Sequence, residues 1–211
     1  MFFALIQDNY VIIGPRLWNK LLFEEALQEE CDITYTLPTR NDDGTPYIIS
    51  DTVKILPITS LPEPVFNSKI QRLNGPYWNF SDTTAKMYFT VCNLPIDAVK
   101  NNLIALVASN RYLAEVGGIK MTIQGTEVSI DTNRGSRDIF FQGYSVLGDT
   151  ETVNWKFPEC WMTLSKAELG TIVESIKAHV QTCFNWEQNK QVEINACQTL
   201  DQLNNIDTNY S

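Results

Sequence analysis

The pattern of apolar and polar positions is most regular in the second half of the chain. After Ser165, apolar side chains recur every three or four positions, as in an amphipathic helix with one face toward a core. Ser165 and Glu168 have the spacing of a capping box, in which each side chain bonds the backbone of the other residue. We therefore predict a long helix that runs to about Gln191. Its apolar stripe consists of Leu169, Ile172, Val173, Ile176, Val180, Cys183 and Phe184.

Further helices and two hairpins are predicted around this segment. A helix begins at Ile96 and ends at Gly117-Gly118, where glycine supplies the positive φ that is common after a helix end. Another helix begins near Thr132 or Asn133, and a second capping box over 199–202 opens a final helical turn. Alternation of apolar and polar residues predicts hairpins. They combine 119–123 with 126–130, and 153–157 with 160–163.

The first half of the chain is expected to be rich in strands and interrupted by proline. Residues 2–6 and 10–13 have the pattern of a hairpin, and Gly14-Pro15 is expected to open a helix that ends near Glu29. Residues 61–64, Leu-Pro-Glu-Pro, are expected to form an extended arm or a surface loop. Further short strands are predicted at 33–37, 47–49, 52–56, 77–80 and 86–91.

These patterns predict an α+β fold with short antiparallel strands and hairpins. About three substantial helices are expected, including the long C-terminal amphipathic helix. The change of pattern near Pro95 predicts two units. Residues 1–94 would form a strand-rich region with one helix and proline-rich connections. Residues 95–211 would form a domain of the order helix, hairpin, helix, hairpin, long helix.

Charge and hydropathy exclude two classes of partner. The net charge is −9, with 25 acidic and 16 basic residues and no run of Lys or Arg, whereas nucleic-acid binding needs a basic surface. No apolar run approaches the roughly 20 residues that span a bilayer, so we expect no membrane insertion. The first residues lack the basic start of a signal peptide, and we expect synthesis in the cytoplasm.

Residues capable of chemistry are few. The five cysteines are widely spaced without a Cys-x-x-Cys pair, which favours free thiols over disulfides or a zinc site. The one histidine, His179, could lie above Cys183, but a packed imidazole beside a buried thiol is favoured over a catalytic pair. Carboxylates such as Asp97, Glu115 and Asp131 are interpreted as solvated surface charge rather than a glycosidase pair. We therefore predict no catalytic residue, no metal site, no cofactor and no enzymatic activity.

Two groups of residues are candidates for protein interfaces. Arg72, Tyr77 and Trp78 lie in an aromatic and polar stretch, and these residue types dominate binding hot spots. The same stretch could equally be a turn into a core strand. His179 and Trp186 lie within ~20° of one another on one flank of the C-terminal helix, beside its apolar stripe. Trp186 could widen the contact within the chain or anchor a neighbouring subunit.

From about Pro95 to residue 206, the order of these elements is similar to that of a known domain family. The segments that carry the resemblance are 111–119, 131–134, 155–157, 164–169, 178–184 and 197–203. The family has no assigned function and is found at the C-terminal end of many tail and tail-fibre-assembly proteins of tailed bacteriophages. The resemblance implies a location in the virion tail and partners among tail, baseplate or fibre proteins in a multimeric assembly. The resemblance implies no catalytic activity, and it assigns no functional residue to this chain.

Three functions are therefore considered. The first is a structural component of a tailed-phage tail, baseplate or tail-fibre attachment apparatus that acts through protein–protein interfaces. The alternative is a tail-fibre assembly chaperone that is absent from the finished virion. It is placed second because residues before Pro95 do not match the pattern expected of such a chaperone. A more distant alternative is a tail-borne protein that binds or cleaves glycans.

Overall fold

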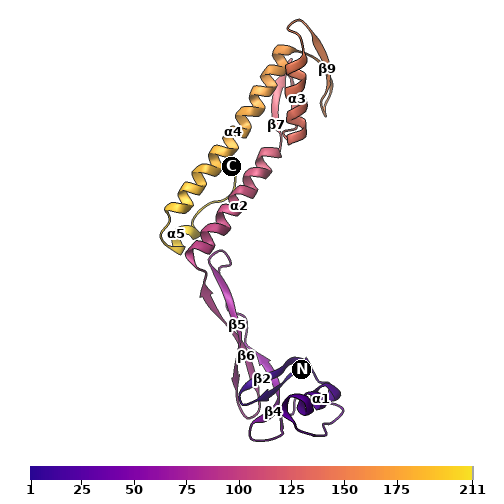
Figure 1. The fold of residues 1–211 in the computed structure, drawn as a ribbon, viewed down its shortest axis with the longest axis vertical. Helices are drawn as coiled ribbons and strands as arrows, with labels where there is room; N and C mark the ends of the chain where they lie inside the picture. The colour runs from indigo at the N-terminus through magenta and orange to yellow at the C-terminus, as the bar shows by residue number, and fades with distance from the viewer. Residues whose placement is uncertain (211) are drawn as a thin grey trace. The chain divides into compact units, whose positions relative to one another are not determined.

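The chain consists of two compact units, one ending at Asn93 and the other beginning at Leu94. The structure is a computed structural model that describes residues 1–210 (Figure 1). Five helices occur within these residues, four of them of 12 residues or more, together with several hairpins. The predicted α+β class with a long C-terminal helix is confirmed.

Six strands form a single sheet in the first unit. They are β1 (Phe2–Gln7), β2 (Tyr10–Leu17), β3 (Tyr47–Ile48), β4 (Val53–Ser60), β5 (Gln71–Phe80) and β6 (Ala85–Asn93). The order is β2-β1-β4-β6-β5, and β3 pairs with β4. Every pair is antiparallel except β4 with β6, which are parallel neighbours. They run in the same direction because β5, which lies between them in the sequence, returns antiparallel to β6. This parallel pair was not predicted from the sequence.

The helix α1 (Lys20–Cys31) covers one face of this sheet. Its buried residues Phe23, Ala26 and Leu27 pack in one cluster with Phe3 and Leu5 of β1. A smaller cluster on alternate positions contains Ala4 and Ile6 of β1 with Leu56 and Ala85. Because successive side chains of a strand point to opposite faces, β1 contributes to both clusters.

Two predictions for this unit are wrong. No helix begins at Gly14-Pro15, because β2 continues to Leu17, which pairs with Phe2 of β1. Pro15 is tolerated there because β2 is an edge strand and its missing N–H costs no ladder bond. The helix begins after Asn19, whose side chain accepts a hydrogen bond of 3.2 Å from the Leu22 amide.

The second error concerns 33–37, which forms no strand. Side chains hold this segment instead of a strand partner. Glu24 of α1 accepts a hydrogen bond of 2.7 Å from the Leu37 amide, and the indole of Trp18 donates to the Pro38 carbonyl at 3.1 Å. An apolar run of this length does not distinguish a strand from a loop tied down by side chains.

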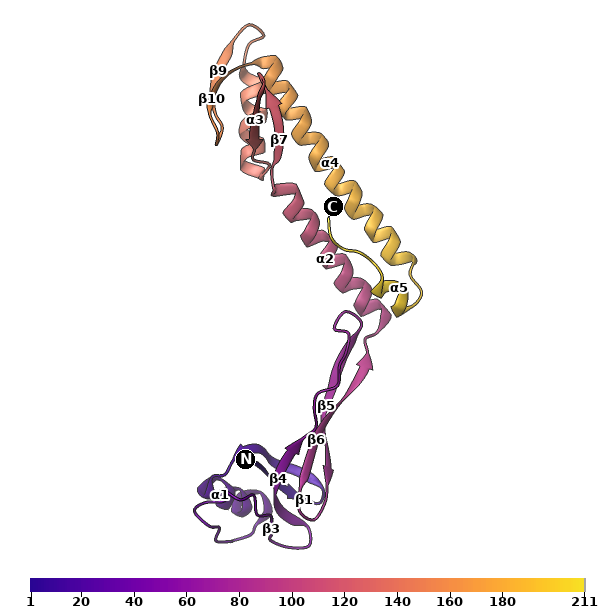
Figure 2. The same ribbon diagram turned by 180° about the vertical axis from the view of Figure 1, so that it is seen from behind.

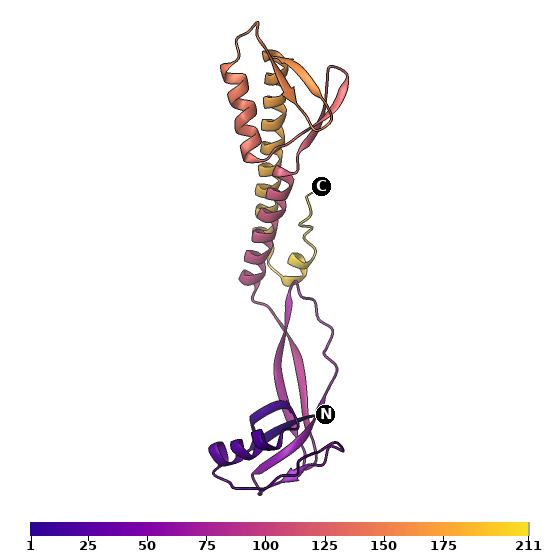
Figure 3. The ribbon, with the colours of Figure 1, turned by 90° about the vertical axis from the view of Figure 1, so that its right-hand side faces the viewer.

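The second unit combines two long antiparallel helices with two hairpins and a shorter helix. Its elements are α2 (Ile96–Val116), β7 (Ile119–Ile123), β8 (Thr126–Ile130), α3 (Arg134–Val146), β9 (Thr152–Lys156), β10 (Trp161–Ser165), α4 (Lys166–Ala196) and α5 (Leu200–Asn204). Figures 2 and 3 show α2 alongside the second half of α4, and α3 with the hairpins beside its first half. Lys100 contacts Asn195, and Arg111 contacts Glu187, which fixes the antiparallel direction.

One core cluster is formed by α3, the hairpins and the first half of α4. Its buried members are Ile123, Val128, Ile130, Phe140, Phe157, Leu164, Leu169, Ile172 and Ile176. Both predicted capping boxes are present, at Ser165 with Glu168 and at Thr199 with Gln202. α4 runs to Ala196, five residues beyond the predicted end, since the buried Ile194 continues its apolar stripe.

Candidate interaction surfaces

A buried carboxylate joins the three main helices of the second unit. Glu115, in the last turn of α2, is only 1% exposed. Arg137 of α3 donates from Nη2 to Glu115 Oε1 at 2.6 Å, and Arg111 pairs with the other carboxylate oxygen. Arg111 also donates from Nε to Glu187 of α4 at 2.8 Å. The interpretation of Glu115 as a solvated surface charge was therefore wrong, whereas Asp97 and Asp131 are exposed as expected.

The electrostatics of this cluster keep Glu115 ionised. Burial is the largest influence and raises its pKa, but the hydrogen bonds and charges of Arg137 and Arg111 together lower the pKa below the ordinary value. The pKa of Arg111 is raised although its burial lowers it, because Glu187 and Glu115 both favour the charged guanidinium. The cluster is thus a closed ionic network in which every charge has a partner.

The end of α2 is fixed to the start of α3 by a second contact. The buried hydroxyl of Thr132 donates to the Glu115 carbonyl at 2.6 Å and accepts from the Gly118 amide at 3.0 Å. Gly118 has φ +84°, and a Cβ at this position would lie 3.0 Å from the Ile130 carbonyl oxygen. Glycine is required here because the backbone is both left-handed and closely packed. α2 and α3 are therefore held in a defined relative position.

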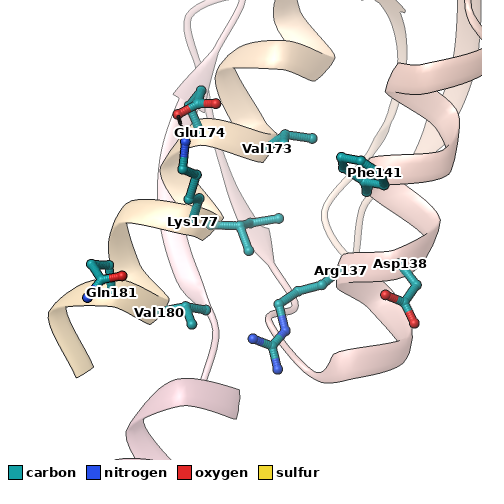
Figure 4. Close-up of a pocket in the computed structure, with 9 residues that line it drawn as sticks. Arg137, Asp138, Phe141, Val173, Glu174, Lys177, Val180 and Gln181 are labelled. Carbon is teal, nitrogen blue, oxygen red and sulfur yellow. Dashed lines mark hydrogen bonds and ion pairs between the residues drawn. The ribbon is translucent and has the colours of Figure 1, made fainter. Parts of the chain in front are cut away.

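An open groove of about 540 Å³ lies between α3 and α4 (Figure 4). Val173, Ile176 and Val180 of α4 form its apolar wall, and Figure 4 shows Phe141 of α3 pointing toward Val173. Phe141 is 60% exposed. Charged and polar side chains surround the apolar surface: Arg137, Asp138, Glu174, Lys177 and Gln181. An aromatic ring beside an apolar wall with a charged rim is an arrangement typical of protein-binding surfaces.

The candidate residue His179 lies half-buried between α4 and α2. Its Nε2 lies 3.0 Å from the Ala114 carbonyl oxygen and 3.8 Å from the Cys183 sulfur. A carbonyl only accepts hydrogen bonds, so this geometry places the proton on Nε2. That nitrogen is then unable to take a proton from the Cys183 thiol. The arrangement is a packed imidazole beside a buried thiol.

The second candidate on this flank, Trp186, contacts the C-terminal tail of the chain. The ring of Tyr210 packs edge-on to Trp186 with 5.1 Å between ring centroids. The Cys183 thiol donates to the Tyr210 hydroxyl at 3.4 Å. Its proximity to Cys183, with burial next in importance, raises the pKa of Tyr210 to about 12. Trp186 is half-buried and makes the intramolecular contact that was one of its two predicted roles.

The three candidates on β5 do not form a single patch. β6 pairs with β5 through a register shift between Asn74 and Tyr77, so the alternation of faces changes along β5. Arg72 opposes Cys92 and Tyr77 opposes Tyr88, which places both on one face of the ribbon. Trp78 opposes Met87 on the other face, stacks on Phe80 and packs against the cluster of Ala4 and Leu56. Arg72 and Tyr77 are exposed, whereas Trp78 is half-buried against the core.

The groove beside Phe141 was not predicted from the sequence. Phe184, assigned to the buried stripe of α4, is instead 44% exposed, and the Arg111 guanidinium lies over its ring at 4.6 Å. The one available signal for the ionic network was the four-residue spacing of Arg111 and Glu115 on α2.

All five cysteines are free, but only Cys183 and Cys197 are buried.

The strands at the two ends of the order β2-β1-β4-β6-β5 each carry a proline, Pro15 in β2 and Pro76 in β5. Proline on an edge strand removes a backbone donor and disfavours the addition of a further strand. Contacts of this unit with other proteins are therefore expected through side chains rather than through strand addition.

Residues 98–209, slightly more than half of the chain, match the family model described as a domain of unknown function (DUF4376). The chain therefore belongs to this family. Neither a curated protein nor a solved structure matches it. Within residues 1–210, no helix combines the length and the apolar character needed to cross a membrane.

Proposed function

We propose that this family member is a structural component of a tailed-phage tail, baseplate or tail-fibre attachment apparatus and acts through protein–protein interfaces. The phage location rests on a resemblance in sequence. The segment from Pro95 to residue 206 resembles a domain found in tail and tail-fibre-assembly proteins. Action through interfaces rests on the groove between α3 and α4. The proposal assigns no catalytic role to any residue.

The exposure of Phe141 is the observation that carries the interface part. A phenylalanine that presents 60% of its surface beside Val173 and Val180 keeps apolar area in contact with water. Burial of such area by a partner is favourable by about 25 cal/mol per Å². Aromatic residues at the centre of an interface often dominate its binding energy.

The walls of the groove support the same proposal. Arg137, which lines one end, is held by Glu115, and Glu115 is held in turn by Arg111. Helices fixed in this way do not have to reorganise when a partner binds, which lowers the entropic cost of association. A rigid, partly apolar groove suits permanent assembly better than transient chemistry.

Mass spectrometry of gradient-purified virions tests the proposal. The expected result is that the protein is present in a fixed copy number that matches the tail symmetry. Absence from virions, with co-purification of the protein and the fibre from infected cells, would replace the proposal by the assembly-chaperone alternative. Release of saccharides from host-surface glycans by the purified protein would instead favour the glycan alternative.

A further inference from the structure

The C-terminal tail, residues 205–210, lies in no helix or strand. Its burial alternates: Ile206 is buried and Thr208 and Tyr210 are half-buried, whereas Asp207 and Asn209 are exposed. A period of two residues is that of an extended segment with one side against the protein. The tail is thus attached to the second unit at every second residue.

Two of these attachments involve the long helices. Asn110 of α2 donates from Nδ2 to the Thr208 carbonyl at 2.7 Å. Tyr210 reaches α4, where its hydroxyl accepts from the Cys183 thiol at 3.4 Å and its ring packs against Trp186. The tail therefore bridges α2 and α4 on the flank of α4 that also carries His179.

Release of the tail would change this flank without breaking either helix. Backbone hydrogen bonds of α2 and α4 do not depend on residues 205–210. Segments outside regular structure open with a lower free energy than the core elements on which they lie. Cys183 has no exposed surface and its thiol contacts the Tyr210 hydroxyl, so the thiol reports such an opening.

We propose that residues 205–210 form a strap that opens locally, without unfolding of α2 and α4, and controls access of a partner protein to the flank made by His179, Cys183 and Trp186. That the partner is a protein rests on the proposed function, whereas the local opening of the strap does not depend on it. The contacts that the strap makes define which features a partner segment needs in order to take its place. A competing segment is extended, presents an aromatic side chain in place of Tyr210, and offers a backbone carbonyl in place of Thr208.

Alkylation of the full-length chain by iodoacetamide, read out for each cysteine by peptide mass spectrometry, tests the strap. Tyr210→Ala should raise the alkylation rate of Cys183 at least tenfold, while the rates at Cys92 and Cys160 stay unchanged. Tyr210→Phe keeps the ring against Trp186 and removes only the hydroxyl that contacts the thiol, so its effect should be smaller. Asn209→Ala is the matched control, because Asn209 is exposed and bonds Asp207 within the tail.

The dependence on urea separates local from global opening. The alkylation rate of Cys183 in the unchanged protein should be insensitive to low urea, because local opening exposes little surface. The proposal is overturned if Cys183 reacts only at the rate of global unfolding, or if Tyr210→Ala leaves that rate unchanged. It is also overturned if Tyr210→Ala accelerates all cysteines of the second unit to the same extent, since the tail would then be part of the core. None of these readouts requires a phage, so failure of the strap and failure of the proposed function remain distinguishable.

Discussion

Arg137 Nη2 lies 2.6 Å from Glu115 Oε1, and this contact ties the first turn of α3 to the last turn of α2. The same carboxylate pairs with Arg111, which pairs in turn with Glu187 of α4. One residue therefore takes part in the placement of three helices. Because the groove lies between two of them, its shape depends on an ionic contact outside its apolar wall.

Substitution of Glu115 should be strongly destabilising. Glu115→Gln keeps the size of the side chain but removes the counter-charge of Arg137 and leaves Arg111 paired with Glu187 alone. Removal of one partner of a buried pair costs about 3–5 kcal/mol. We expect a loss near the lower limit, because Arg111 and Arg137 retain some exposure. Urea denaturation measures the change. Glu127→Gln, which removes an exposed partner of Lys120, is the control and should cost at most about 1 kcal/mol. Equal losses in the two variants would contradict a structural role for the network.

The same network predicts an acid-sensitive stability. The pKa of Glu115 is lower in the folded protein than its ordinary value of 4.5, so folding favours the ionised form. Its contribution is complete above pH 4.5 and is lost as the pH falls through the lower folded pKa. The free energies of unfolding of the unchanged protein and of Glu115→Gln should be measured from neutral pH to pH 3, a range of about four units. The two values should converge as the pH falls. A constant difference between the two across this range would show that Glu115 is not ionised in the folded state.

Phe141→Ser tests the groove as an interface. The ring is mostly exposed, so we expect a change in stability within about 0.5 kcal/mol, as for surface substitutions. Incorporation into virions should fall if the groove is covered in the assembly. Ile139→Ser is the matched control, since Ile139 has similar exposure on the same helix but does not line this groove. Equal effects of the two variants on incorporation would argue against a specific role of the groove.

Trp186→Ala distinguishes the two roles predicted for this residue. Its ring is half-buried against Tyr210, so we expect a loss of about 2 kcal/mol, below the ~3–5 kcal/mol of a fully buried tryptophan. Thermal denaturation of the purified protein measures this loss. Trp161→Ala provides the control, because Trp161 is 68% exposed and its removal should leave stability nearly unchanged. If Trp186→Ala also leaves the melting temperature unchanged but lowers incorporation into virions, Trp186 acts as an anchor for another subunit rather than within the chain.

A fragment that begins at Leu94 should fold by itself. The main hydrophobic cluster of the second unit contains only residues beyond this point, from Ile123 to Ile176. A domain with its own core is expected to unfold in one cooperative transition. Circular dichroism during heating checks this expectation. A fragment that is unfolded or aggregates would mean that its core requires residues 1–93.

The helices of the second unit were predictable because their signals are local. A capping box such as Ser165 with Glu168 involves residues three positions apart, and the apolar stripe of α4 follows from helical period alone. In the first unit the signals were weaker. Gly14-Pro15 has the composition of a helix start, and only the pairing of Leu17 with Phe2 decided that β2 continues through it.

The sequence by itself determined which faces of each helix are apolar, where the helices of the second unit begin, and that the cysteines are too widely spaced for a local metal or disulfide motif. Only the tertiary structure decided what covers each face. Periodicity gives the direction of a side chain around its own helix axis, but whether another element lies in that direction depends on residues far away in the chain. Glu115 is buried because Arg137 approaches from α3, and Trp186 is covered because Tyr210 returns along α4. Phe141 remains exposed because no element of the described chain fills the space between α3 and α4.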